Sequence, residues 1–426
     1  MEQLEDGYLR ERAEDVRDVS DRLVRTILNK PRTSPAHLME PGIIVANDLT
    51  PSDTAHFDKA NVLGFVTEKG GVTSHTAILA EALGIPAIVG VKDVLREIQD
   101  KEELIIDGRE GLAVVEPSRE TRQTYATRRE QLEEDATELR ERAKLPGATR
   151  NGKTVEVAAN TGSPKDVDTA LKMGADGVGL YRTEFLFLDR DSPPTEDEQF
   201  EAYRVVLERF NGRPVILRTL DIGGDKEVPY LNIAKELNPS LGVRAIRLCL
   251  RNRDLFRTQL RAILRASAYG KARIMYPMIA VKEEILEANA VLEEVRKELG
   301  AGRVDFDKNV EVGIMVEIPS AALNAEELAD YVDFFSIGTN DLTQYTFAAD
   351  RTNEKLSYLY QPLNSAVLGL IKMMVDASHK KGKWTGVCGE LAGDPEAIPT
   401  IVGLGVDELS MSSQKIPLAK KILSRL

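Results

Sequence analysis

The sequence predicts an α/β protein in which a small domain of strands and helices precedes a C-terminal (β/α)₈ TIM barrel. The first observation is a group of short apolar runs between residues 42 and 117, separated by glycine, proline and aspartate. The second is that strand-like runs alternate with long amphipathic helices after Asn151. The third is that nearly every later run ends in Arg, Asp, Glu, Asn or Cys, at the end where barrels place their chemistry.

Length, composition and net charge limit the classes of protein to which this chain can belong. With 426 residues, 42% of them hydrophobic and 29% charged, the chain is long enough for two or three ordinary domains. No apolar run approaches the roughly 20 residues that span a bilayer, and the N-terminus does not resemble a targeting peptide, so we expect a cytoplasmic protein without a membrane span. The net charge of -13 argues against nucleic acid as the main partner.

Residues 1–30 are predicted to form an amphipathic helix that needs a partner surface. Its apolar side chains share one helical face: Leu9, Ala13, Val16, Leu23 and Ile27. Pro31 ends the pattern.

Residues 31–117 are predicted to form the small sheet-rich domain. Its strand-like runs are Ile43–Ala46, Val62–Thr67, Ala87–Gly90, Glu103–Asp107 and Leu112–Pro117. A charged linker helix follows over residues 118–147 and ends at Pro146-Gly147. This helix is interpreted as a solvated connection, in preference to an acidic binding face.

Residues 148–426 contain eight strand-like runs, which fit the length of a (β/α)₈ barrel. They begin at the residue in parentheses: VEVAAN (155), GVGLYRTEF (177), PVILRTLDIGG (214), ARIMYPMIA (272), VEVGIMVEIPS (310), VDFFSIGTND (332), WTGVCGELAG (384) and DELSMS (407). A doubly wound open sheet is the structural alternative, because counting repeats does not distinguish the two.

A glycine-rich turn carries the most distinctive histidine. Residues 70–78, GGVTSHTAI, follow a strand-like run and open a helix, so His75 is expected near a helix N-terminus. Free N–H groups there disfavour imidazolium and favour a bound anion, which suits a nucleophilic imidazole that takes up phosphate. The alternative is that Thr73 or Ser74 caps the helix and His75 is a surface residue. The other histidines lack such a turn: His37, His56 and His379.

Seven segments in sequence order carry a family resemblance. They are GGVTSHTAILAEALGIPAIVG, LYRTEFLF, ILRTLDIGGDK, NPSLGVRAIR, VGIMVEIPSA, FFSIGTNDLTQYTFAADR and GVCGELAGD. The chain resembles the phosphoenolpyruvate (PEP)-utilising family that contains enzyme I of the sugar phosphotransferase system, pyruvate phosphate dikinase and PEP synthase, and is most similar to enzyme I. The resemblance implies that residues 31–117 are a swivelling phosphohistidine domain, that His75 accepts a phosphoryl group, and that the barrel binds PEP.

Arginines are the predicted substrate-binding residues. Arg182 and Arg218 each end a barrel run and Arg351 follows the sixth run, so the three converge on one rim if the barrel forms. Guanidinium groups bind phosphate and carboxylate bidentately, and PEP offers both; a lone arginine would more often be a surface ion pair. By resemblance, these substrate-binding residues also belong to the site: Arg244, Lys226, Asn340 and Asp341.

Two carboxylates are the predicted metal ligands. Glu317 and Asp341 end neighbouring runs, and Mg²⁺ typically takes one or two carboxylates and completes its shell with water and substrate oxygens. The resemblance assigns both residues to Mg²⁺. A structural Glu–Asp pair would need a cationic partner, and neither run contains one.

The two cysteines receive different interpretations. Cys249 and Cys388 are far apart and lack a CxxC spacing, so neither a disulfide framework nor a thiolate zinc site is supported. Cys249 fits a small buried hydrophobic residue. Cys388 lies among glycines at the end of the seventh run, and the resemblance implies that it donates or accepts the proton at C3 of enolpyruvate.

The resemblance implies a PEP-protein phosphotransferase that phosphorylates His75, releases pyruvate and passes the phosphoryl group to a histidine-containing phosphocarrier protein. Most of the carrier-docking region that precedes residue 31 in such proteins is missing, and residues 1–30 resemble its last helix. A homodimer formed through the barrel is also implied. The alternatives are a fragment of a dikinase or synthase, which would need ATP chemistry from another chain, and a PEP sensor that transfers nothing.

Overall fold

The computed structural model describes residues 40–49, 61–70, 80, 85–188, 190–223, 228–231, 236–351 and 353–426. The chain forms two compact units that divide between Glu134 and Asp135, within helix α5 (Arg119–Ala143). The predicted domain limits stay predictions, and the helix predicted over residues 1–30 lies outside the described residues.

The described part of the first unit is built on two small sheets. Strands β1 (Gly42–Ala46), β2 (Val62–Thr67) and β3 (Ala87–Ile88) are parallel, and β4 (Leu104–Asp107) and β5 (Leu112–Val115) form an antiparallel pair. Phe65 and Val66 of β2 point to opposite faces, and both are fully buried. Val66 packs in one cluster with Val94 of α4 (Val94–Glu97), so both faces of the sheet are covered. These strands confirm the predicted sheet-rich segment.

Helix α5 confirms the predicted charged helix. Within the first unit, Arg122 of α5 forms an ion pair with Glu103 at 2.6 Å. Within the second unit, Glu138 of α5 forms an ion pair with Lys421 at 2.7 Å. The helix therefore forms ion pairs within each unit, and most of its other side chains are exposed.

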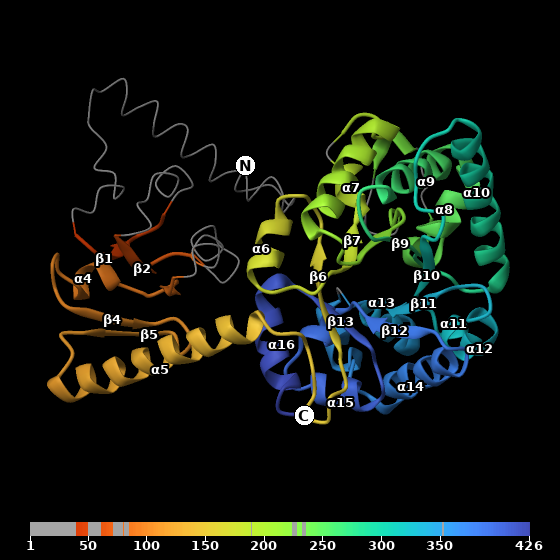
Figure 1. Ribbon diagram of the computed structural model, residues 1–426. Coiled ribbons are helices and arrows are strands. Elements are labelled where there is room, and N and C mark those ends of the chain that lie inside the picture. Colours follow the sequence, from red (N-terminus) through yellow and green to blue (C-terminus); the bar gives the residue numbers. More distant parts are fainter. Residues whose placement is uncertain are drawn as a thin grey trace, which may run out of the picture. The chain divides into compact units, whose positions relative to one another are not determined.

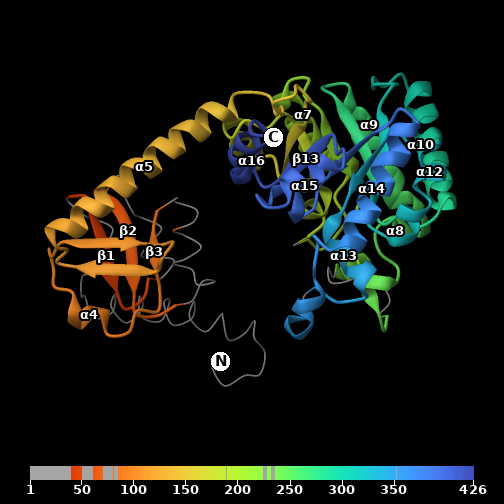
Figure 2. The ribbon, with the colours of Figure 1, turned by 90° about the horizontal axis from the view of Figure 1, so that it is seen from below.

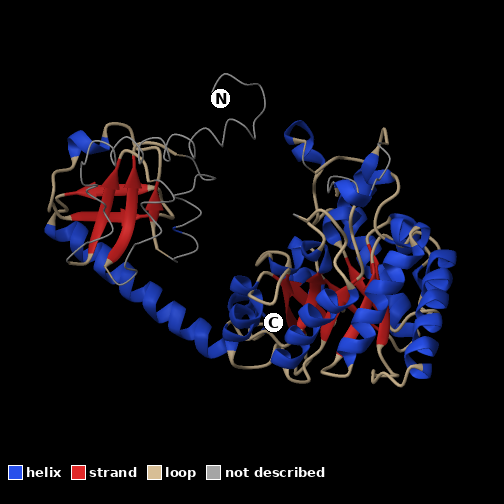
Figure 3. Cartoon of the chain, turned by 90° about the horizontal axis from the view of Figure 1, so that it is seen from above, coloured by secondary structure: helices blue, strands red, loops and turns tan. Residues whose placement is uncertain are grey.

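The second unit is a closed parallel barrel of eight strands, which confirms the predicted fold and overturns the open-sheet alternative. Figures 1 and 3 show the strands surrounded by helices. The strands are nearly continuous apolar runs because both faces of a barrel strand are buried. In chain order they are β6 (Glu156–Thr161), β7 (Val178–Arg182), β8 (Val215–Arg218), β9 (Ala272–Tyr276), β10 (Glu311–Val316), β11 (Phe334–Ile337), β12 (Trp384–Val387) and β13 (Glu408–Met411).

Helices surround the barrel, as Figure 2 shows from below, and they bury apolar side chains against it. In α9, Phe256, Leu260 and Ile263 are buried at helical spacing, and α7 begins at Thr195, which forms a capping box with Glu198. No helix in the described residues is long and apolar enough to cross a membrane. The helices are α6 (Asp166–Lys172), α7 (Glu196–Phe210), α8 (Ile246–Arg251), α9 (Arg253–Ser267), α10 (Lys282–Ala301), α11 (Pro319–Leu323), α12 (Ala325–Leu328), α13 (Thr339–Phe347), α14 (Ser365–Lys380), α15 (Ile398–Gly403) and α16 (Ile416–Leu423).

The first and last strands of the barrel, β6 and β13, close it at a seam. Ser410 Oγ of β13 donates to Asn160 Oδ1 of β6 at 2.6 Å. Asn160 Nδ2 donates to the carbonyl oxygen of Cys388 at 3.1 Å. The seam therefore holds the backbone that follows β12. Inside the barrel, a separate apolar cluster fills the lumen: Leu180, Ile216, Met275, Met315, Phe334 and Cys388, with Trp384 packed against it.

Candidate active site

A cavity of about 480 Å³ lies at the carboxyl-terminal ends of the barrel strands. Its lining includes every predicted barrel residue that the structure describes: Arg182, Arg218, Arg244, Glu317, Asn340, Asp341, Arg351 and Cys388. The predicted residues His75 and Lys226 lie outside the described residues. The barrel thus gathers into one cavity side chains that are up to two hundred positions apart in the sequence.

The strands place these side chains because parallel barrel strands all end at the same rim. Arg182 and Arg218 are the last residues of β7 and β8, and Glu317 directly follows β10. Asp341 lies in the first turn of α13, which begins two residues after β11. Cys388 directly follows β12.

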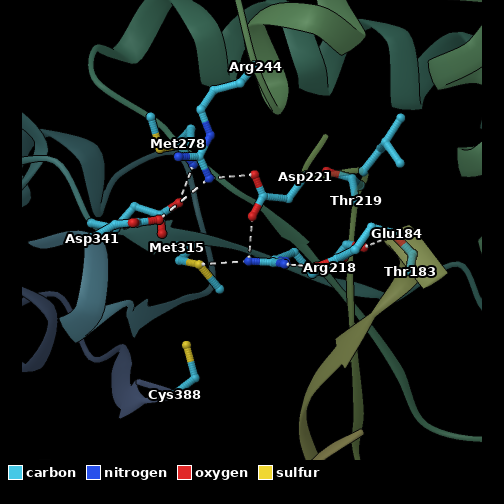
Figure 4. A network of polar contacts seen from close by, with 12 residues as sticks. Thr183, Glu184, Arg218, Thr219, Asp221, Arg244, Met278, Met315, Asp341 and Cys388 are labelled. Carbon is cyan, nitrogen blue, oxygen red and sulfur yellow. Dashed lines mark hydrogen bonds and ion pairs between the residues drawn. The ribbon is translucent and has the colours of Figure 1, made fainter. Parts of the chain in front are cut away.

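Asp221 bridges two buried arginines at the centre of the cavity (Figure 4). Its Oδ2 lies 2.9 Å from Arg218 Nη1, and its Oδ1 accepts from Arg244 Nη2 at 2.9 Å. Arg218 also reaches Glu184 Oε1 at 2.5 Å through Nη2. Arg218 and Arg244 are only 6% and 5% exposed, so these carboxylates fix both guanidinium groups in place.

Both buried arginines keep their charge. Burial acts to lower the pKa of Arg218, but Glu184 and Asp221 outweigh it and raise that pKa above its ordinary value. For Arg244, burial is likewise outweighed by Asp221 and Asp341, which raise its pKa. The cavity therefore presents two permanent cations held by carboxylates.

Helix α9 supports the backbone that carries Arg218. Gln259 Oε1 accepts from the backbone N–H of Leu220 at 2.9 Å, and Gln259 Nε2 donates to Thr183 Oγ1 at 3.1 Å. Thr183 Oγ1 in turn donates to the carbonyl oxygen of Arg218 at 2.8 Å. Gln259 and Thr183 are buried, so one side chain of α9 ties together the ends of β7 and β8.

Arg244 reaches the cavity from the segment before α8. Its Nη1 donates to the hydroxyl of Tyr345 at 3.3 Å, and that hydroxyl donates to the carbonyl oxygen of Ser240 at 2.6 Å. Gly223 has a φ of +104°, and a Cβ there would lie 2.7 Å from Arg244 Cβ. Glycine is thus required at this close approach, and Tyr345 links α13 to the arginine-bearing segment.

Two further arginines border the cavity with more exposure. Arg351 Nη1 lies 3.7 Å from Asp341 Oδ1, and its side chain is 37% exposed. Arg182 is exposed and makes no ion pair with the described residues. These guanidinium groups are open to an anionic ligand, in contrast to the buried pair.

Glu317 is the most buried carboxylate that the metal prediction invoked. It is 2% exposed, and its Oε1 accepts from the backbone N–H of Met278 at 2.7 Å. Burial raises the pKa of Glu317 to about 8, with further increases from Asp341 and Asp221, although Arg244 opposes the shift. Glu317 is therefore a carboxylate kept from water, with two other carboxylates nearby.

This donor set fits a divalent cation held by two carboxylates. Among the described residues there is no group of three or more His, Cys, Asp or Glu side chains that forms a metal cage. Mg²⁺ needs only one or two carboxylates when water and substrate oxygens complete its shell. A cation beside Glu317 and Asp341 would also favour the ionised form of Glu317, whose pKa is raised by burial and by Asp341.

Arg244, predicted as a substrate-binding residue, also forms an ion pair with one of the two predicted metal ligands. Its Nη2 lies 3.6 Å from Asp341 Oδ2, although neither predicted run contains a basic residue. The partner comes from a segment about a hundred residues earlier, which the sequence runs alone do not reveal. Asp341 therefore has the cationic partner that a purely structural role would require. Glu317 forms no ion pair with the described residues.

Cys388 presents a neutral thiol to the cavity. It is 3% exposed, and its Sγ donates to the carbonyl oxygen of Ile337 at 3.6 Å. Burial raises the pKa of the Cys388 thiol to about 12, so the thiol keeps its proton at neutral pH. Cys249 is equally buried, but its Sγ faces the carbonyl oxygen of Leu220 in the shell between strands and helices.

Four residues of the site were missed by the sequence prediction: Glu184, Asp221 and Glu390 line the cavity, and Tyr345 accepts a hydrogen bond from Arg244. Glu184 and Asp221 stand just beyond the ends of β7 and β8, so the rule that polar residues at strand ends face the site would have found them. Glu390 donates its backbone N–H to Asn340 Oδ1 at 3.1 Å. Nothing in the sequence indicated a role for Tyr345, because a tyrosine one helical turn after Asp341 is typical of an ordinary core residue.

Comparison with known proteins identifies the family. Residues 136–426 match the PEP-binding domain of PEP-utilising enzymes, and residues 38–111 match the mobile domain of the same enzymes. The chain belongs to the PEP-utilising enzymes. Among relatives of this PEP-utilising enzyme are proteins named phosphoenolpyruvate-protein phosphotransferase from Geobacillus stearothermophilus, Priestia megaterium and Bacillus subtilis, which are 52%, 51% and 52% identical to it. The alignments cover 100% of this chain and 74%, 74% and 75% of theirs. The resemblance inferred from the seven segments is confirmed.

Proposed function

We propose that this enzyme is a PEP-dependent phosphotransferase that moves the phosphoryl group of PEP to His75 and releases pyruvate. The observation that carries the proposal is one cavity that combines arginines with the neutral thiol of Cys388. PEP needs cations for its phosphate and carboxylate and an acid for its C3 carbon. The name shared by relatives of 51–52% identity supports transfer to a protein group.

In this proposal the arginines divide the work of binding. Exposed Arg182 and Arg351 meet the incoming anion, while Arg218 and Arg244 are already oriented by Asp221. Asn340 lines the same wall, and Lys226 assists binding from outside the described residues. Most of the catalysis would come from positioning and charge neutralisation, as expected for a loose phosphoryl-transfer transition state.

The proposed reaction separates into a step at phosphorus and a step at carbon. The bond between the enol oxygen and phosphorus breaks, its electron pair stays on that oxygen, and a bond forms between phosphorus and a nitrogen of His75. The Cys388 thiol then gives its proton to C3 of the enolate, which becomes pyruvate, and solvent in the cavity returns a proton to sulfur. Cys388 is suited to this because its thiol is neutral and lines the cavity.

Glu317 and Asp341 would hold Mg²⁺, which supplies charge neutralisation when bound. Support comes from the surroundings of Glu317, where burial and then Asp341 and Asp221 raise its pKa to about 8. At pH 7 Glu317 is therefore mostly protonated without the cation, so metal binding releases a proton and metal affinity should rise as pH increases from 7 to 8.

Adding Mg²⁺ should raise the thermal unfolding midpoint of the wild-type chain, because a ligand that binds only the folded state stabilises it. At a hundred times its Kd the gain would be about 2.7 kcal/mol. Glu317→Gln should remove most of this gain. Glu390→Gln is the matched control, since Glu390 lines the cavity but is not assigned to the metal. Equal stabilisation of wild type and Glu317→Gln would contradict the assignment.

The function is tested by incubating the chain with PEP labelled in the phosphoryl group. Wild type should acquire acid-labile label, and His75→Ala should acquire none, while its affinity for PEP stays within about twofold. The control is His379→Ala, because His379 contacts Asp407 at 2.8 Å and lines no part of the cavity. If His75→Ala still acquires label, His75 is not the phosphoryl acceptor. If His75→Ala also loses PEP binding, the assignment of His75 and PEP binding to separate domains is wrong.

Repeating this incubation with a histidine-containing phosphocarrier protein separates the main proposal from its alternatives. Transfer of the labelled phosphoryl group to the carrier protein indicates the phosphotransferase. Transfer that requires an added nucleotide indicates a dikinase or synthase fragment. A labelled phosphoryl group that stays on the chain indicates a sensor. A homodimer through the barrel, a cytoplasmic location and a role in sugar transport follow only from the resemblance and stay predictions.

A further inference from the structure

The barrel lumen carries a second polar layer at the amino-terminal ends of its strands, opposite the cavity. Glu156 and Glu408 begin β6 and β13 and are paired in register. Trp384 begins β12, and Arg273 is the second residue of β9. Arg273 is in register with Ile216, a lumen residue, so its side chain points inward as well.

These side chains are buried, and part of their hydrogen-bonding capacity is unused. Glu408 is 1% exposed and Arg273 is 7% exposed. Four buried atoms of the layer have no hydrogen-bond partner among the described residues: Glu156 Oε1, Glu408 Oε1, Arg273 Nη1 and Trp384 Nε1. A buried polar group without a partner costs about 1–3 kcal/mol, so four in one layer point to a small polar ligand.

Contacts across the layer bring Arg273, Trp384 and Glu408 together, and Glu156 lies beside Glu408 in the strand register. The guanidinium carbon of Arg273 lies 4.6 Å from the centre of the Trp384 ring, and that ring stacks on Phe334. A Cβ on Gly386 would lie 2.9 Å from Glu408 Oε1 and 3.4 Å from the Trp384 ring. The glycine therefore leaves room in which the carboxylate and the indole meet.

The chemistry of the four atoms identifies the ligand. Two of them, on Glu156 and Glu408, accept hydrogen bonds, and two, on Arg273 and Trp384, donate them. A water molecule accepts two hydrogen bonds and donates two, so one water satisfies this set. N–H groups do not coordinate cations, which argues against a metal ion at this position. Arg273 Nε is already occupied by Glu311.

The charge in the layer is unbalanced. Burial raises the pKa of Glu408 to about 8, and the neighbouring Glu156 raises it further, while Arg273 acts in the opposite direction. Burial also raises the pKa of Glu156. The other charged groups that act on this pair are Asp176 and Glu311, which favour protonation of Glu156, and Lys271, which opposes it; Glu408 in turn acts on the Cys388 thiol.

We propose that the amino-terminal end of the lumen is a ligand site that binds one water molecule and one proton between Glu156 and Glu408. The proton removes the repulsion between two carboxylates that share a single arginine, and the water joins them to Arg273 and Trp384. None of these four side chains lines the cavity, and Glu408 acts on it only through its electrostatic effect on the Cys388 thiol.

Trp384 is the single tryptophan of the sequence, so in the folded chain the tryptophan fluorescence comes from a side chain of this layer. Emission of the folded full chain should change in one step as pH is raised from 6 to 9.5, with a midpoint near 8. Glu408→Gln should abolish the step. Glu156→Gln should lower its midpoint by about one pH unit or more, because the repelling charge is gone. Glu317→Gln is the matched control and should leave the step unchanged, since Glu317 lies at the other end of the barrel.

Two results would overturn the proton site: wild-type emission that is constant over this range, or a step that survives in Glu408→Gln. The wild-type measurement decides the matter even if a variant fails to fold. High-resolution diffraction at pH 7 tests the water. A single water within about 3.2 Å of Trp384 Nε1 and the Glu408 carboxylate is expected, and direct contact between those two groups would exclude it.

Discussion

Replacing Asp221 with alanine is expected to lower the free energy of unfolding by about 3–5 kcal/mol, because it removes a shared partner from two buried charges. Asp221 contacts Arg218 and Arg244 at 2.9 Å each, and both guanidinium groups are almost completely buried. Arg218 would keep Glu184, but among the described residues Arg244 would retain only Asp341, at 3.6 Å, as an ion-pair partner, beside its hydrogen bond to Tyr345. Denaturant unfolding, followed by Trp384 fluorescence, measures the loss.

The same substitution should reduce affinity for PEP, since the two arginines would no longer be oriented before the ligand arrives. Asp197→Ala is the control for removing a carboxylate: Asp197 pairs with Arg265 at 2.8 Å, but its side chain is 81% exposed. That pair should contribute less than about 1 kcal/mol. If Asp221→Ala costs no more than Asp197→Ala, the bridging role of Asp221 is wrong.

Cys388→Ala should separate chemistry at carbon from chemistry at phosphorus. The proposed thiol acts after the phosphoryl group has left, so single-turnover labelling of His75 should persist. Exchange of solvent deuterium into C3 of pyruvate should fall by about a hundredfold or more, which is the usual contribution of a positioned acid. Since the pKa of Cys388 is raised to about 12, its thiol should stay protonated between pH 6 and 10, and the wild-type exchange rate should not fall through loss of this acid.

Cys249→Ala is the matched control, because Cys249 is equally buried and its pKa is also raised to about 12. It lies in the outer shell and should change only packing, so exchange should stay within about twofold of wild type. Equal exchange rates in wild type and Cys388→Ala would reassign Cys388 to the core.

The strands were predictable from the sequence because both of their faces are buried. The run predicted from residue 332 contains β11 and the first turn of α13, and the run from residue 214 contains β8 and the loop that holds Asp221. These runs extend past the strands because they include the polar and glycine residues of the rim. Closure was not predictable from repeats, since it depends on the pairing of β6 with β13 across the whole domain.

The site was predictable where a strand end alone fixes the position, as for Arg218, Glu317 and Cys388. The ion-pair partners of these residues could not be predicted, because Arg244 contacts Asp341 only after two distant segments fold together. Burial was also invisible in the sequence. Arg218 and Arg182 end neighbouring strands in the same way, yet one is buried between two carboxylates and the other is exposed.

The seam between β6 and β13 has a consequence for folding kinetics. Asn160 and Ser410, whose side chains join there, are 250 residues apart in the sequence, so their contact carries a large loop-closure entropy. Asn160 also holds the carbonyl oxygen of Cys388, which ties the proposed proton donor to this late contact. During synthesis β6 emerges long before β13, so the cavity wall around Cys388 is completed only when the last strand docks. Any nascent or truncated chain that lacks β13 thus carries the arginines without the geometry that would let them act together with the thiol.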